Sequence, residues 1–188
     1  MKEVLTIGFV ATAISPYFSE EQQVRIKSEN HLKKIIAEYD AKLICFHKTI
    51  FSKEDSVEAE KFFKNKIDFL ILQTSSCSSG EQLYPLCNIT NKMGLWAVPD
   101  LENEGDVKLH SLVSVSHYLG IIKKILHEKK IKTKWFYNYG DTDEFKKKFL
   151  ITLRSLVADK KIKQSKIGLV GGISVSYTHL TLPTTGIV

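Results

Sequence analysis

Short, mostly apolar runs alternate with longer charged segments along most of the chain. Five of these runs are typical of strands buried on both faces of a sheet; they cover residues 4–11, 41–50, 67–73, 94–99 and 133–139. After each run, apolar residues recur with a helical period, which predicts helices over residues 19–40, 52–63, 81–92, 111–128 and 141–160. Another apolar run, at residues 166–170, predicts the start of a sixth strand.

Strands that alternate with helices predict βαβ units and a parallel sheet. Five such units within residues 1–164 predict an α/β fold: a flavodoxin-like, doubly wound parallel five-stranded sheet with helices on both faces, in three αβα layers. The strand order expected for this fold is 2-1-3-4-5. Capping residues mark the helix starts, with Ser52 or Asp55 before the second helix and Asp141 or Thr142 before the fifth.

The domain boundaries follow from the same pattern. We expect residues 1–164 to form the flavodoxin-like domain, and residues 165–174 to be the first strand of a truncated second domain. Residues 167–188 contain no Asp, Glu, Lys or Arg, and their SVSYTHLTLPTT stretch resembles a translated sequencing adapter. We therefore expect residues 175–188 to be a non-native tail on a piece of a longer protein.

Composition narrows the class of protein. The chain has 27 Lys and Arg against 21 Asp and Glu, a net charge of +6, but its basic residues fall on predicted helix surfaces without the interleaved aromatics of a nucleic-acid site. No apolar run approaches the roughly 20 residues that a membrane-spanning helix needs. Three cysteines without metal-site spacing fit a reducing compartment. We therefore expect a cytoplasmic protein that binds neither nucleic acid nor membrane.

Two loops flank the place where a doubly wound sheet binds ligands. That place is the carboxyl end of the strands, where the strand order reverses, here between the first and third strands. The loops are residues 12–18 (TAISPYF) and 74–81 (TSSCSSGE). Both are rich in hydroxyls and the first carries two aromatic rings, which suits a polyhydroxylated ligand. Ordinary Ser-rich turns and helix caps explain the same residues, so the residues alone leave both readings open.

Other chemistries have weaker support. No Gly-x-Gly-x-x-Gly or P-loop pattern favours a dinucleotide or phosphate site, and the acids that follow the first loop disfavour a flavin phosphate. His110 and His117 fit one helix face, but two imidazoles do not make a metal site. Asp141 and Asp143 suit either a hard cation or helix capping. Cys77 is either a nucleophile without an identifiable base or a half-buried thiol.

The order of several segments resembles one known family. Residues 74–81 (TSSCSSGE), 94–119 (GLWAVPDLENEGDVKLHSLVSVSHYL), 132–145 (KTKWFYNYGDTDEF) and 166–174 (KIGLVGGIS) follow one another. This order resembles the N-terminal domain of the L-fucose isomerase and L-arabinose isomerase superfamily, and is most similar to the fucose isomerase-like members. The resemblance covers residues 3–174.

The resemblance implies a metal-dependent aldose–ketose isomerase. In that family a divalent metal, typically Mn²⁺, polarises the sugar carbonyl while carboxylates move a proton between carbons. The family's metal ligands and catalytic residues lie in later domains, so the resemblance implies that this chain holds none of them and binds no Mn²⁺ itself.

The resemblance also implies a homo-oligomer in which the N-terminal domain lines a neighbouring subunit's sugar site. Carried over, the sugar-binding residues would be Ser15, Tyr17, Ser75, Ser76 and Glu81. The best-known fucose isomerases have a Trp where this chain has Ser76, so the sugar, such as L-fucose or L-arabinose, stays open. A stand-alone sugar-binding or regulatory module without catalysis, and a flavodoxin-like redox or signalling domain, are the alternatives.

Overall fold

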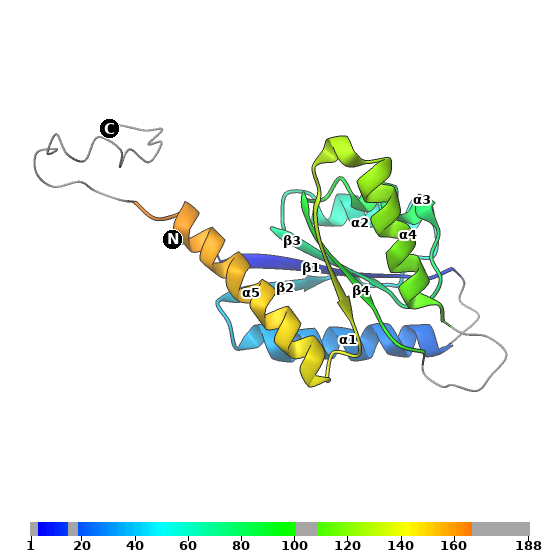
Figure 1. Cartoon of the computed structure of the whole chain (residues 1–188), viewed down its shortest axis with the longest axis horizontal. Helices are drawn as coiled ribbons and strands as arrows, with labels where there is room; N and C mark the ends of the chain where they lie inside the picture. The colour runs from blue at the N-terminus through cyan, green and yellow to red at the C-terminus, as the bar shows by residue number, and fades with distance from the viewer. Residues whose placement is uncertain (1–3, 15–18, 101–108, 167–188) are drawn as a thin grey trace, which may run out of the picture.

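A parallel sheet forms the centre of the molecule. The computed structural model describes residues 4–14, 19–100 and 109–166. Within them the strands lie in the order β2-β1-β3-β4-β5, and Figure 1 shows the sheet between its helices. Their bounds are Leu5–Thr12 (β1), Ala41–Cys45 (β2), Phe69–Thr74 (β3), Lys92–Ala97 (β4) and Lys132–Tyr137 (β5). All neighbouring strands pair in parallel, which confirms the predicted flavodoxin-like, doubly wound sheet.

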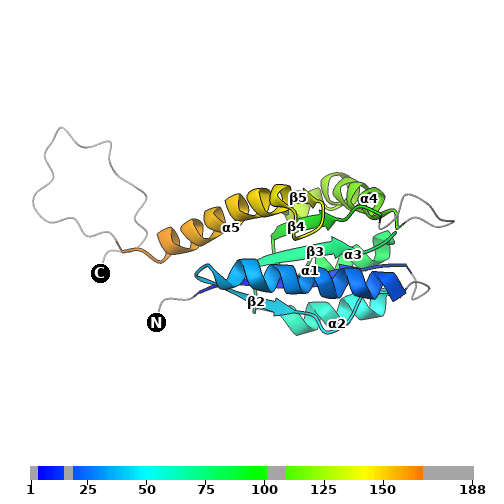
Figure 2. The same ribbon diagram turned by 90° about the horizontal axis from the view of Figure 1, so that it is seen from below.

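Helices cover both faces of this sheet and complete the three layers (Figure 1). One face carries α1 (Ser19–Ala37) and α5 (Asp143–Lys163). The other carries α2 (Lys53–Phe63), α3 (Gly80–Leu86) and α4 (Ser111–Lys124), and a 3₁₀ turn, η1 (His127–Lys129), follows α4. Figure 2 shows that the last turns of α5 extend beyond the sheet.

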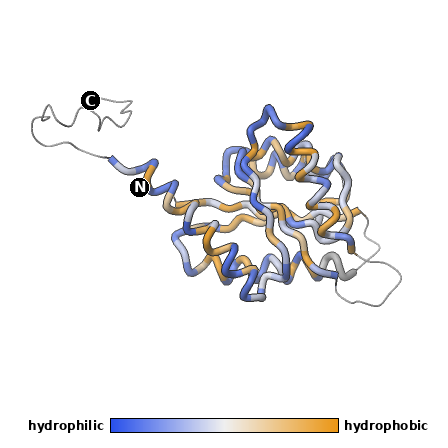
Figure 3. Tube along the Cα trace, viewed as in Figure 1, coloured by the Kyte–Doolittle hydropathy of each residue, from blue (hydrophilic) through white to orange (hydrophobic). Residues whose placement is uncertain are grey.

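Two hydrophobic cores lie on the two faces of the sheet. Alternate strand residues enter alternate cores, so Phe69 and Ile71 pack under α1 and α5, whereas Leu70 and Leu72 pack under α2, α3 and α4. Every residue of β3 is buried. Figure 3 shows hydrophobic residues along the central strands, and both hydrophobic and hydrophilic residues along the helices. The continuous apolar runs of the sequence are therefore explained by burial on both faces.

Some element boundaries differ from the predictions. The second strand ends at Cys45 rather than at residue 50. The chain leaves the sheet there and returns at Ile50, which bridges to Thr12 and donates its N–H to the Ala11 carbonyl at 2.8 Å. Phe46 and Ile50 belong to this loop, but their side chains are buried in the core. They therefore continue the apolar pattern of the sequence beyond the end of the strand. The predicted sixth strand, apart from Lys166, lies outside the described residues.

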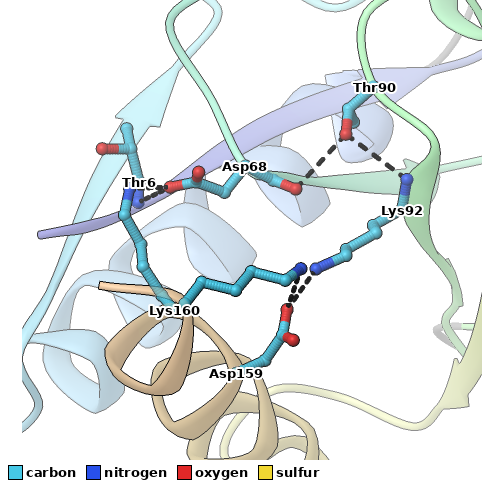
Figure 4. Close-up of polar contacts among 7 residues, drawn as sticks. Thr6, Asp68, Thr90, Lys92, Asp159 and Lys160 are labelled. Carbon is cyan, nitrogen blue, oxygen red and sulfur yellow. Dashed lines mark hydrogen bonds and ion pairs between the residues drawn. The ribbon is translucent and has the colours of Figure 1, made fainter. Parts of the chain in front are cut away.

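Ion pairs attach the end of α5 to the end of the sheet at which the strands begin (Figure 4). Asp68 Oδ2 accepts hydrogen bonds from the Thr6 N–H at 2.8 Å and from Lys160 Nζ at 2.7 Å. Asp159 Oδ2 accepts from Lys92 Nζ at 2.7 Å. Some of the lysines that give the chain its positive charge are thus paired with carboxylates. We call this end of the sheet the amino edge.

A first prediction concerns the acid stability of this network. Hydrogen bonds from Lys92 and Lys163 lower the pKa of the Asp159 carboxyl to about 2. A lowered pKa contributes stability above the unfolded-state pKa of about 4, and that contribution is lost as the pH falls to about 2. The gap in thermal midpoint between the wild type and Asp159→Asn should therefore be largest near neutral pH, and should narrow between pH 4 and pH 2.

Thermal unfolding followed by circular dichroism across this pH range checks the prediction. The control is Asp141→Asn, which removes an exposed carboxyl that has no ion pair within the described part of the chain. Its midpoint should run parallel to that of the wild type. A gap for Asp159→Asn that stays constant across the range would contradict the role of this pair.

Candidate functional site

The predicted ligand position lies where β1 and β3 end side by side. Thr12 and Thr74, the last residues of these strands, are partners in the sheet, and the Ser75 N–H continues the pairing by donating to the Thr12 carbonyl at 2.9 Å. The chain continues from β1 toward β2 on one side and from β3 toward β4 on the other. This end of the sheet, called the carboxyl edge below, is therefore the topological switch point.

The structure describes three of the five residues predicted to bind sugar. Ser75 and Ser76 lie directly after β3, and both are buried. Ser75 Oγ donates to Gln73 Oε1 at 3.2 Å, and Ser76 Oγ to the Cys77 carbonyl at 3.3 Å. Glu81 is exposed in the first turn of α3. Ser15 and Tyr17 lie outside the described residues. Sugar binding by these two residues and by Ser75, Ser76 and Glu81 stays a prediction.

Hydroxyl groups fix the loop after β3 to its neighbours. Thr12 Oγ1 and Ser78 Oγ share a hydrogen bond of 2.9 Å, which joins this loop to the end of β1. Ser114 Oγ, on α4, accepts from the Ser78 N–H at 2.8 Å. All three residues are buried. The Ser-rich segment is thus held in place on two sides, as expected for buried polar groups, which rarely lack partners.

The start of α4 is joined to β3 and β4 in the same way. Thr74 Oγ1 donates to the Ser111 carbonyl at 2.8 Å. Ser111 Oγ accepts from the Val98 N–H at 2.9 Å and donates to the Thr74 carbonyl. Ser111 is the first residue of α4. Its side chain therefore satisfies backbone groups at the ends of two strands at once.

Gln82 joins three loops at this edge. Its Nε2 donates to the Ala13 carbonyl at 2.7 Å and to the Ile50 carbonyl at 3.3 Å, and its Oε1 accepts from the Ser79 N–H at 3.1 Å. Tyr118 OH donates to the same Oε1 at 3.3 Å. Burial raises the pKa of Tyr118 to about 12, so this phenol is a neutral donor at physiological pH. The loops after β1, β2 and β3 are thereby fixed relative to one another.

A second polar pair lies on the α1 side of the sheet. Gln73, the penultimate residue of β3, is fully buried, and its Nε2 donates to Ser28 Oγ of α1 at 2.5 Å. Ser28 is also buried. Since Gln73 Oε1 accepts from Ser75, this pair positions one of the predicted sugar-binding serines. The sequence could have indicated a role for Gln73, because it is a polar amide near the end of a strand whose preceding residues are apolar.

The structure also shows the environment of the cysteines and acidic residues considered for other chemistries. Burial raises the pKa of Cys45 and of Cys87 to about 12, so these thiols stay protonated and unreactive. Cys77 is partly buried. Thr142, rather than Asp141, caps α5 by accepting from the Phe145 N–H at 3.3 Å. Among the described residues no three His, Cys, Asp or Glu side chains lie close enough to hold a metal ion.

In the part of the chain that the structure covers, no helix is both long enough and apolar enough to cross a membrane. The resemblance to sugar isomerases rests on the order of sequence segments and stays a prediction. No protein-family model and no curated protein matches this chain.

Proposed function

We propose that this domain is the N-terminal, oligomer-building domain of a metal-dependent aldose–ketose isomerase that acts on a free sugar such as L-fucose or L-arabinose. The observation that carries the proposal is the chemistry of the carboxyl edge at the switch point. Hydroxyl and amide side chains gather there around Ser75 and Ser76. Neutral donors and acceptors suit a polyhydroxylated ligand that carries no charge.

The charges around this edge also favour a neutral ligand. Residues 74–80 contain no Lys or Arg. In the loop after β2, Lys48 Nζ is paired with Asp55 at 2.6 Å and with Glu58 at 2.8 Å. Glu81, which directly follows residues 74–80 in the sequence, is exposed and carries a negative charge. A phosphate group would meet no unpaired cation in these loops, so a free sugar fits better than a sugar phosphate or a flavin nucleotide.

The proposed reaction needs a divalent metal, and the described residues do not provide a binding site for it. When bound, Mn²⁺ would polarise the sugar carbonyl. The described residues bring no three metal-ligating side chains together, so we derive no catalytic step from them. In the proposed enzyme this domain builds the homo-oligomer and forms one wall of the sugar site, while metal and proton transfer belong to other domains. Cys45, Cys77 and Cys87 are unpaired thiols, in keeping with the cytoplasmic location that we propose.

The test is made on the gene and on the protein. The coding DNA beyond codon 174 is expected to encode large domains with a Glu, Asp and His metal set. The longer protein should interconvert an aldose and a ketose with Mn²⁺, whereas the 188-residue chain should not. Turnover by the 188-residue chain, or a gene that encodes no such domains, would refute the proposal. A gene that stops soon after codon 172 would favour the stand-alone sugar-binding module.

A further inference from the structure

The strand β5 lies at an open edge of the sheet. Among the described strands it pairs only with β4, and Figure 2 shows it at the outer side of the sheet, beside α4 and α5. Two aromatic side chains on one face of β5, Trp135 and Tyr137, are 47% and 36% exposed. Such side chains are enriched in protein–protein interfaces, and an edge strand offers its backbone to another chain. This edge is therefore a candidate docking surface.

The backbone of β5 turns hydrogen-bonding groups outward along this edge. The Lys132 N–H donates to the Asn91 carbonyl at 2.8 Å, so Lys132 faces β4. Because alternate residues of a strand turn their N–H and C=O groups to opposite sides, Thr133, Trp135 and Tyr137 turn theirs away from β4. Three residues of β5 are thus placed to extend the sheet by one more strand.

The chain itself leads away from this edge. Near the end of α5, Lys161 Nζ lies 3.2 Å from Asp40, which directly precedes β2 at the opposite edge. The connection from β1 to β2 passes through α1, on the face that α5 also covers (Figure 1). A return from α5 to the outer side of β5 would cross this face in the opposite direction, and such left-handed crossovers are rare. A second copy of the chain is therefore a better occupant than a further strand of the same chain.

Charge is distributed unevenly along the edge. Lys132 and Lys134, in the first half of β5, are exposed and have no carboxylate partner among the described residues. Just after the strand, Asn138 Nδ2 donates to Glu144 Oε2 at 2.7 Å, so an exposed carboxylate is held beside its end. Asp141, which is also exposed, adds a second negative charge there. One end of the edge is thus basic and the other acidic, so two antiparallel copies are complementary.

We propose that two copies of this chain form a dimer by antiparallel pairing of their β5 strands about a two-fold axis at Trp135. A two-fold axis uses the same surface on both subunits, and in an antiparallel pair two opposite residues exchange both of their hydrogen bonds. Pairs centred on Trp135 join this residue to its own copy, and Thr133 to Tyr137 of the partner subunit. This register uses every outward-facing residue of β5 and makes the two sheets continuous.

The charges favour this register over its neighbours. It places Lys132 opposite Asn138 of the partner subunit, and hence beside the partner subunit's Glu144. Shifting the axis to Lys134 would set two lysines directly opposite each other, which destabilises a strand pair. Shifting it the other way would leave Thr133 opposite a residue beyond the end of β5.

This inference rests on the proposed function for its expectation of a homo-oligomer, and it names the surface that forms one. Lysines on an edge strand also serve to keep other strands away, which is the competing role for Lys132 and Lys134. Lys148 Nζ, 3.8 Å from the Trp135 ring centroid, belongs to a flexible side chain that can turn aside. A contact of this size suits a weak dimer, with a dissociation constant of about 0.1 mM.

Sedimentation equilibrium of the full chain, at concentrations on both sides of this value, measures the self-association. Thr133→Pro removes an outward N–H without removing a bond to β4, and should raise the dissociation constant by about tenfold or more. Lys132→Glu and Glu144→Lys should each raise it by about tenfold, because the two-fold axis counts each change twice. The double variant restores opposite charges, and should return to within about threefold of the wild type.

A control variant and a second measurement identify the surface. Lys27→Glu makes the same change of charge on an exposed part of α1, and should leave the dissociation constant unchanged. Amide hydrogen exchange reports on single residues. The N–H groups of Thr133, Trp135 and Tyr137 should become protected as the protein concentration rises, whereas that of Lys134, which faces β4, should be protected at every concentration.

The outcomes separate this inference from the proposed function. A chain that stays monomeric, or a dimer that either Thr133→Pro or the charge reversals leave unchanged, would overturn the inference. A double variant that dimerises no better than the single ones would also overturn it, and the charge variants decide if Thr133→Pro does not fold. A dimer through β5 that binds neither L-fucose nor L-arabinose would contradict the proposed function alone, whereas a monomer that binds one of these sugars would contradict the inference alone.

Discussion

Replacing Gln82 by Leu is expected to lower the free energy of unfolding by about 3–5 kcal/mol. Leu fills a similar volume but offers no hydrogen bonds. The Ala13 carbonyl and the Ser79 N–H each lose the partner that Gln82 now supplies, whereas the Tyr118 hydroxyl keeps the Ser79 carbonyl at 3.2 Å. Gln82 is only 1% exposed and its bond to the Ala13 carbonyl is buried, so water reaches this carbonyl poorly, whereas the Ser79 N–H is partly buried. Each buried group left without a partner costs about 1–3 kcal/mol.

Urea denaturation followed by circular dichroism measures this loss. The matched control is Gln23→Leu, which removes an exposed amide from α1 and should change the free energy of unfolding by less than about 0.5 kcal/mol. A loss below about 1 kcal/mol for Gln82→Leu would mean that the three loops are not held together by this side chain.

Replacing Trp96 by Ala is expected to cost about 4–5 kcal/mol. Trp96 is fully buried in β4, and its ring stacks on that of Phe145 from α5 with 4.4 Å between the ring centroids. Its Nε1–H also donates to the Asn138 carbonyl at 2.8 Å, just after β5. The substitution therefore leaves a large cavity between the sheet and α5, and removes the partner of a backbone carbonyl.

The chain's other tryptophan provides the control. Trp135 lies on the neighbouring strand β5, beside Leu95, and is 47% exposed. Lys148 Nζ lies 3.8 Å from its ring centroid, an exposed cation–π contact worth about 0.5–1 kcal/mol. Trp135→Ala should therefore cost far less than Trp96→Ala. Equal losses in urea denaturation would contradict the burial described for the two rings.

The fold was predictable because each strand and helix carries its own pattern. A strand buried on both faces must be apolar throughout, as in residues 69–72 of β3. A helix on the outside must alternate with the helical period, as α5 does with buried Phe145, Phe149 and Leu153. These patterns are local, so they determine the order of the elements and, through the short parallel connections, the strand order.

The polar network at the carboxyl edge was only partly predictable. The sequence places the serines after β3, but not what they contact. Gln82 bonds to Ala13, which is 69 residues away, and Ser28 bonds to Gln73 at a separation of 45 residues. Such contacts depend on the packing of helices against the sheet. Thr49 shows the same limit, because its hydroxyl is buried without a hydrogen-bond partner in the described part of the chain, and nothing in the sequence indicates this.

If the carboxyl edge binds a free sugar, one titration shows this binding most directly. The full chain, labelled with ¹⁵N, is titrated with L-fucose and with L-arabinose. We expect saturable shifts in the amides of Ser75, Ser76 and Ser78 with one of the two sugars, and none in those of Thr90 and Lys92 at the amino edge. Shifts at the amino edge instead, or no saturable shift with either sugar, would contradict the claim.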